Sequence, residues 1–143
     1  NGIARPLFGF ISDYLGRENT MCLAFMIEGI GIYCLYLFGH NPVAFVLLSG
    51  VLFLAWGEIY SLFPAIMTDI YGPKYVNTNY GMLFTAKGVA SLLVPLGNVL
   101  TTATGSWGIV FATLGSFDIL AALIAVLLVK PMRARAMAAS ADA

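Results

Sequence analysis

Two basic residues, Arg5 and Lys87, lie inside apolar stretches of the chain. A cation at the centre of a bilayer costs about 2.5–3.5 kcal/mol to insert, so a partner or a water-filled cavity must offset that penalty. Charged residues inside membrane segments typically mark substrate pathways or counter-ion sites. We therefore regard Arg5 and Lys87 as candidate ligands of an anion.

Three acidic residues, Glu28, Glu58 and Asp118, also lie well inside apolar stretches. An ion pair with one of them is the alternative role for either cation. Glu58 is two positions from Trp56 and two from Tyr60, about 200° around a helix at 100° per residue, so it is predicted to point away from the face they share. The rotational positions of Glu28 and Asp118 do not follow from the sequence, and their roles stay open.

Aromatic residues accompany the two cations at helical spacing. Trp56 and Tyr60 are four positions apart and share one helix face, and Phe84 precedes Lys87 by three positions. Ordinary helix packing explains such a stripe equally well. The alternative is an aromatic wall that excludes water, stacks on a flat ligand and donates an indole or hydroxyl hydrogen bond.

The composition shows what must position these residues. Of the 143 residues, 60% are hydrophobic and 10% are charged, whereas about 25% are charged in soluble domains. The mean hydropathy is +0.90. The net charge is zero, which gives no electrostatic footprint for nucleic acid. We expect a polytopic membrane protein, embedded in a lipid bilayer, with no nucleic-acid partner.

Apolar stretches of about 20 residues between short polar or Gly/Pro segments predict transmembrane helices. The sequence predicts an all-α transmembrane bundle of one partial and four full helices, over residues 1–14, 19–38, 42–71, 78–103 and 107–129. Pro95 should kink the fourth helix, residues 78–103. Lys130 and Pro131 should end the last helix, so that residues 1–130 form the membrane domain and 131–143 a disordered cytoplasmic tail. Small residues such as Gly81 and Gly88 predict close helix approach.

The remaining basic residues predict the orientation, because Lys and Arg are retained on the cytoplasmic side. All five fall in alternate connections or in the tail: Arg17, Lys74, Lys130, Arg133 and Arg135. The connections around His40 and Gly105 contain no Lys or Arg. We therefore expect a multi-pass protein of the inner (plasma) membrane, with the Arg17 and Lys74 loops and the C-terminus in the cytoplasm.

Arg5 and Lys87 are then the two basic residues that topology does not explain. Each lies about nine residues from the cytoplasmic end of its helix, or roughly 13 Å at 1.5 Å per residue. That depth is close to the midplane of a hydrocarbon layer about 30 Å thick. The two cations are predicted to share a plane.

The segment from Gly9 to Arg17 resembles the G-x-L-x-D-x-x-G-R loop signature of the major facilitator superfamily. It departs from that pattern at Glu18, where a second basic residue is usual. The resemblance implies the part of a twelve-helix transporter from helix eight onward, with missing N-terminal helices completing it. It also implies a cytoplasmic gating loop made by Gly9, Asp13, Gly16 and Arg17; a purely structural turn is the alternative.

Residues 1–6, 56–64 and 85–95 resemble the oxalate:formate antiporter family more closely. In that family, basic residues on helices eight and eleven bind the substrate, which implies this role for Arg5 and Lys87. Aromatic residues on helix ten also belong to the substrate site in that family, which implies a substrate-binding role for Trp56 and Tyr60. Phe84 is added to the site, although a more polar aromatic residue is expected there.

The resemblance implies exchange of oxalate for formate by alternating access. Oxalate carries two carboxylates, which matches the two cations. One alternative is a proton-coupled monocarboxylate symporter, in which Lys87 pairs with Glu58 or with an acid outside this chain; another is a non-transporting receptor of the same fold. The sole histidine, His40, lies in a loop without a nucleophile or metal-ligand cluster, so we expect no enzymatic activity, no cofactor and no metal.

Overall fold

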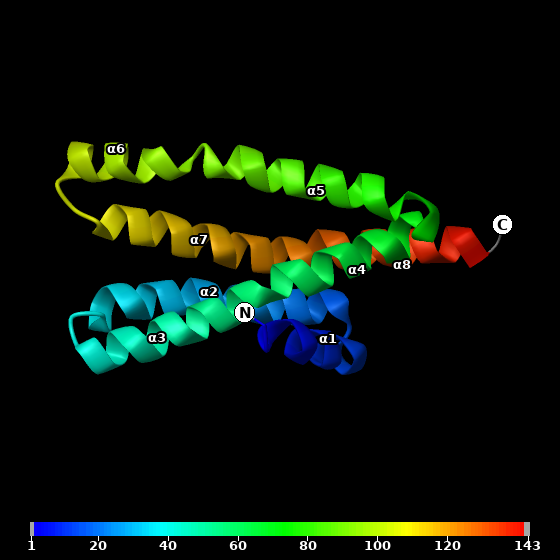
Figure 1. Ribbon diagram of the computed structural model, residues 1–143, viewed down its shortest axis with the longest axis horizontal. Helices are drawn as coiled ribbons and strands as arrows, with labels where there is room; N and C mark the ends of the chain where they lie inside the picture. Colours follow the sequence, from blue (N-terminus) through cyan, green and yellow to red (C-terminus); the bar gives the residue numbers. More distant parts are fainter. Residues whose placement is uncertain (1, 142–143) are drawn as a thin grey trace.

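A computed structural model describes the backbone of residues 2–141 and their side chains, except those of Glu58 and residues 139–141. The described residues are mostly α-helical and include no strand. In chain order the helices are α1 (Ala4–Leu15), α2 (Arg17–Phe38), α3 (Pro42–Ala55), α4 (Ile59–Tyr71), α5 (Val76–Ser91), α6 (Val94–Thr104), α7 (Gly108–Ile124) and α8 (Lys130–Ala141). They run roughly along the long axis of the molecule (Figure 1).

Four continuous helical stretches of the described chain are long and apolar enough to cross a membrane: Arg17–Phe38, Pro42–Tyr71, Pro73–Thr104 and Gly108–Ala138. They coincide with the four full helices predicted from the sequence, and α1 is the shorter first one. The all-α transmembrane fold is confirmed. Local signals explain the boundaries: the Asn41 side chain caps α3 by accepting a hydrogen bond from the Val43 N–H at 2.9 Å.

Two of the membrane-spanning stretches are interrupted near their middle. A 3₁₀ turn, Trp56–Glu58, separates α3 from α4. Between α5 and α6 the helix breaks at Leu92 and Leu93, so the kink predicted at Pro95 is a complete break. This break leaves Pro95 in the first turn of α6. Backbone N–H groups in a first turn have no partner within the helix, so the N–H that proline lacks costs no hydrogen bond there.

The expectation of a disordered tail is wrong for the described residues, because α8 continues the last helix to Ala141. A π-helical turn, Ala125–Val129, precedes Pro131 and alters the backbone where the proline ring would otherwise clash with the preceding turn. The Ala, Met and Arg residues that follow are strong helix formers.

The closest helix contact joins α2 and α7, which lie side by side in Figure 1. A Cβ added at Gly29 would lie 3.0 Å from the Gly115 carbonyl oxygen, and one added at Gly115 would lie 3.1 Å from that of Gly29. Within the described part of the chain, no helix approaches Gly81 or Gly88 closely as predicted, because a Cβ added at either would meet nothing within 4 Å. Backbone contact therefore holds α2 against α7, while α5 has no buried residue.

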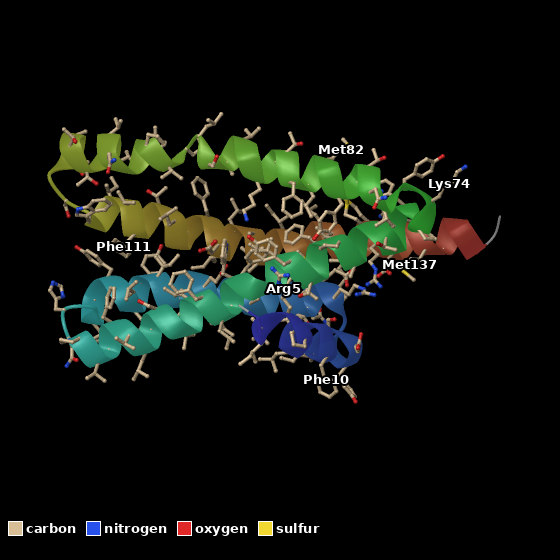
Figure 2. All side chains as sticks on the ribbon, viewed as in Figure 1. Arg5, Phe10, Lys74, Met82, Phe111 and Met137 are labelled. Carbon is tan, nitrogen blue, oxygen red and sulfur yellow. The ribbon has the colours of Figure 1, made fainter. Side chains whose placement is uncertain are left out.

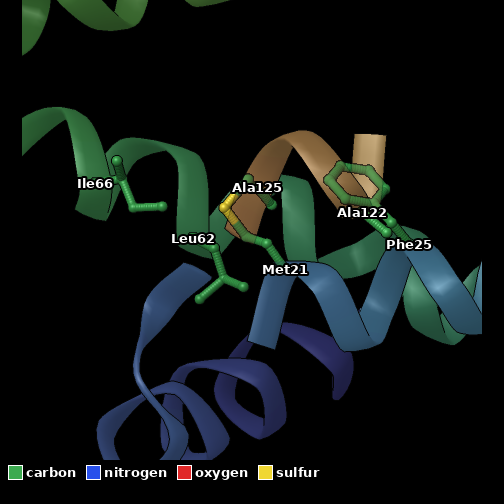
Figure 3. Close-up of a cluster of buried hydrophobic side chains, with 6 residues drawn as sticks. All are labelled: Met21, Phe25, Leu62, Ile66, Ala122 and Ala125. Carbon is green, nitrogen blue, oxygen red and sulfur yellow. The ribbon is translucent and has the colours of Figure 1, made fainter. Parts of the chain in front are cut away.

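A hydrophobic core ties α2 and α4 to the end of α7 and its π-helical turn (Figure 3). Its buried members are Met21, Phe25, Leu62, Ile66, Ala122 and Ala125. Leu62 is 1% exposed and inserts from α4 into this group. The core thereby fixes α4, the helix that carries Tyr60, relative to α2 and α7.

Gly115→Val should destabilise the protein, because the added side chain meets the Gly29 carbonyl and the Tyr33 ring. Overpacking of this kind costs about 1–3 kcal/mol. The matched control is Gly50→Val in α3, where nothing lies within 4 Å of an added Cβ. Thermal melting of the purified, full-length protein should show a lower midpoint for Gly115→Val alone. Equal midpoints for the two variants would contradict the backbone contact.

Candidate functional site

The two intramembrane cations meet at one aromatic ring. Arg5, in the first turn of α1, places its guanidinium carbon 4.7 Å from the centre of the Tyr60 ring. Lys87, on α5, places its ammonium nitrogen 4.6 Å from the same ring centre and donates a hydrogen bond to the Tyr60 hydroxyl. Figure 2 shows Arg5 near the middle of the long axis, away from Lys74 at one end. Arg5 and Lys87, which are predicted to lie at one depth, therefore contact the same ring.

Trp56 extends this aromatic surface. Its ring packs edge-to-face on Tyr60 with the centroids 5.6 Å apart, and it lies 5.3 Å from the Lys87 ammonium. Cation–π contacts are worth about 0.5–1 kcal/mol when exposed and about 2 kcal/mol or more when desolvated. The rings therefore offset part of the cost of holding two like charges inside the membrane.

A cavity of about 270 Å³ opens beside Lys87 between α4 and α5. Its walls include Trp56, Tyr60, Phe84 and Tyr80, with apolar residues completing them. Mostly apolar walls with a few convergent polar groups are typical of small-ligand sites. Arg5 does not line this cavity. It contacts the ring of Tyr60, which does line it.

The sequence analysis missed Tyr80. It stacks against Phe84 with ring centroids 4.8 Å apart and brings a phenol group to the cavity wall. The signal was present in the chain, since Tyr80, Phe84 and Lys87 follow one another at spacings of four and three on one helix face. A polar aromatic residue of the kind expected in place of Phe84 therefore lies one helical turn before it, at Tyr80.

Two of the three acidic residues considered as alternative partners, Glu28 and Asp118, lie elsewhere. Among the described side chains, neither Arg5 nor Lys87 forms an ion pair. Glu28 and Asp118 line a different cavity. The side chain of Glu58 lies outside the described residues, so the prediction of its direction is not assessed.

The loop that resembles the superfamily signature forms a tight turn between α1 and α2. Gly16 adopts a φ of +85° and its N–H donates to the Ser12 carbonyl at 3.0 Å, a backbone region that favours glycine. Arg17 binds Asp69 at the end of α4 with a nitrogen–oxygen distance of 2.6 Å. Asp13 is exposed, and an added Cβ at Gly9 would meet nothing within 4 Å.

A second arginine joins this ion pair from the C-terminal helix. Arg133 lies 2.9 Å from a Glu18 carboxylate oxygen and 2.8 Å from Asp69. The Glu18 side chain is 6% exposed. The departure from the loop signature at Glu18 thus has a structural counterpart, because an acid here binds a cation from α8.

The sequence analysis assigned Arg133 to topology alone and did not identify Asp69. Lys130 also reaches this end, where it donates to the Asn19 side chain at 3.0 Å. Figure 2 places Lys74 and Met137 toward the same end of the molecule. Basic side chains from three connections therefore gather at one end, and its assignment to the cytoplasm stays a prediction.

The fold and these sites define a class of protein. The family model of the Major Facilitator Superfamily matches residues 1–142. The chain belongs to this superfamily and is part of a multi-pass membrane protein.

Among curated proteins, the chain is 39% identical over 116 residues to an oxalate:formate antiporter of Oxalobacter formigenes, covering 78% of this chain and 27% of that protein. It is 30% identical over 126 residues to an uncharacterized 38 kDa protein of Thermoproteus tenax, covering 87% and 32%. It is 23% identical over 112 residues to apicoplast pyruvate carrier 2 of Toxoplasma gondii, covering 78% and 17%. The chain thus spans less than a third of the length of each. No solved structure shows a significant match.

Glu18→Gln and Arg133→Gln should each lower the melting temperature of the full-length protein by several degrees. Arg133→Gln leaves the buried Glu18 carboxylate uncompensated, a loss that costs up to about 3–5 kcal/mol, whereas Glu18→Gln leaves Arg133 paired with Asp69 and should cost less. The double variant should lose less than the sum of the two single effects, since both remove one shared contact. Glu18→Gln combined with Lys74→Gln is the matched pair and should be additive. Additive behaviour of the first pair would argue against coupling between α8 and the loop.

Proposed function

We propose that the intact protein is a secondary transporter that exchanges oxalate for formate by alternating access. The observation that carries this proposal is the contact of Arg5 and Lys87 with the single ring of Tyr60. The similarity to an oxalate:formate antiporter supports the choice of substrates.

Charge matching favours a dicarboxylate at this site. A guanidinium binds one carboxylate through two parallel hydrogen bonds, and an ammonium acts as a flexible point charge for the other. A dianion neutralises both cations, whereas a monoanion such as formate neutralises one. Both cations lie close to the centre of the Tyr60 ring, so the distance between them is at most the sum of their two distances from that centre. A short dicarboxylate suits that distance.

The aromatic residues complete the proposed site. Trp56 and Tyr60 form one wall, and Phe84 with Tyr80 forms another across the cavity. Flat rings stack on a planar anion and exclude water, which strengthens its attraction to the cations. The Tyr60 hydroxyl accepts from Lys87 and so has its own proton free to donate to a carboxylate.

Obligatory exchange follows from the same charges. Two cations without an anion repel one another when water is excluded, so an empty carrier resists closing around the site. A bound anion removes this repulsion and permits the change of access. The loop of Gly9, Asp13, Gly16 and Arg17 then serves as part of a cytoplasmic gate, with the protein in the plasma membrane and residues 131–143 in the cytoplasm.

Lys87→Gln should lower oxalate exchange in proteoliposomes by about 100-fold or more. The proposed closure around the anion buries the contact between Lys87 and a carboxylate, and losing one partner of a buried charge contact costs about 2–5 kcal/mol. Lys74→Gln is the matched control, because Lys74 lies in a loop at the end of the molecule. Both variants should insert and purify like the wild type. Exchange close to the wild-type rate in Lys87→Gln would refute the assignment.

Tyr60→Phe tests the hydroxyl separately from the ring. The variant keeps the surface over which Arg5 lies but removes the acceptor of the Lys87 hydrogen bond, which should weaken oxalate binding about tenfold. Tyr71→Phe, on the same helix at an exposed position, should bind like the wild type. Calorimetric titration of the reconstituted protein with oxalate measures both. Unchanged affinity in Tyr60→Phe would assign the hydroxyl no part in binding.

A further inference from the structure

A second cavity, of about 300 Å³, shares the wall residue Trp56 with the candidate anion site. Its charged lining consists of two carboxyl groups, Glu28 from α2 and Asp118 from α7. The rest of the lining is apolar or aromatic, and no basic side chain of the described chain takes part in it. Trp56 lines both cavities.

Glu28 is held in this cavity without a partner. It is 7% exposed, and no hydrogen bond or ion pair joins it to another described side chain. The close contact of α2 with α7 brings Asp118 next to it, since a Cβ added at Gly29 would lie 3.4 Å from the Asp118 Cβ. Two acids are therefore packed together in a membrane-spanning region.

Other titratable groups do not neutralise the pair. α3 and the π-helical turn, which both pack against α2, have none. Beyond Asp118, the elements packed against α2 carry Arg5, Asp13, Tyr14, Glu58, Tyr60, Asp69 and Tyr71. Arg5 lies over Tyr60, and Asp69 binds two arginines. Asp13, Tyr14 and Tyr71 are exposed, Glu58 has no described side chain, and none of the described groups lines this cavity.

The two carboxyl groups in the cavity favour a proton over a metal cation as the ligand. A metal cation such as Ca²⁺ takes six or more oxygen ligands. No group of three or more His, Cys, Asp or Glu side chains gathers for a metal anywhere in the described part of the chain. A proton needs only one carboxylate oxygen, and it removes the cost of holding two like charges side by side in an apolar site.

We propose that Glu28 and Asp118 form a proton-binding carboxyl pair whose charge is coupled to the anion site across Trp56. Trp56 lies 5.3 Å from the Lys87 ammonium, so charge on the pair acts on Lys87 across one ring. Proton loss would place negative charge behind the cations and weaken their hold on an anion. By reciprocity, an anion at the cations favours the protonated pair. The coupling rests on the proposed anion site, whereas proton binding by the pair does not depend on that site or on the identity of the anion.

Infrared titration of the full-length protein in lipid nanodiscs, without any anion substrate, tests the pair directly. We expect a protonated-carboxyl band that shifts in heavy water and disappears as the pH rises. The double variant Glu28→Gln, Asp118→Asn should lack it. Each isosteric single variant should complete its titration at a lower pH than the wild-type pair, because the last proton to leave no longer creates a second negative charge beside the first. No such band, or one that neither single variant alters, would overturn the proposal.

The same titration tests the coupling. Lys87→Gln removes a nearby positive charge, which should move the midpoint upward by roughly half a pH unit or more. Lys74→Gln, which removes an equal charge at the end of the molecule, should leave it in place. His40→Gln removes the chain's sole histidine and should also leave the band and its midpoint unchanged. A midpoint in Lys87→Gln equal to that of the wild type would refute coupling across Trp56, even if the carboxyl pair itself is present.

Discussion

The contact of two cations with the Tyr60 ring is the interaction on which the rest of this structure depends. A charge in hydrocarbon requires a partner or a cavity, and here two charges of the same sign are held together. Tyr60 supplies both an aromatic face and a hydroxyl, so neither cation is left against lipid alone. The anion that we propose for this site would neutralise the positive charge that the ring offsets only in part.

The helices α2, α4 and α7 hold the Tyr60 ring in place. Gly29 and Gly115 let α2 and α7 meet at their backbones, and the core around Leu62 fixes α4 against them. In contrast, α5 and α6 have no buried residue and bring Lys87 to the site along one edge. The site therefore lies where α5 meets α4, at the margin of the packed group of helices.

The end of the molecule opposite His40 holds a second group of charges. Asp69 receives both Arg17 and Arg133, and Glu18 binds Arg133 again. This network connects the loop between α1 and α2 with α4 and with α8. The network ties α8 to this loop, a contact that a disordered tail would not make.

The sequence by itself determined the membrane class and the number of spanning helices, and it singled out Arg5 and Lys87 as candidate site residues. Hydrophobic length and the cost of buried charge are local properties that read directly from the chain. It also supplied the Trp56 and Tyr60 face, because residues four apart on a helix are neighbours.

Only the tertiary structure decided which side chains meet across helices. It selected Gly29 and Gly115 rather than Gly81 and Gly88 for the close contact. It separated Glu28 and Asp118 from the cations, although all four lie inside apolar segments. Arg133 likewise became an ion-pair partner through the fold, 115 residues from Glu18 along the chain. The physical reason is that the rotation and pairing of helices depend on packing between distant segments, which no local pattern encodes.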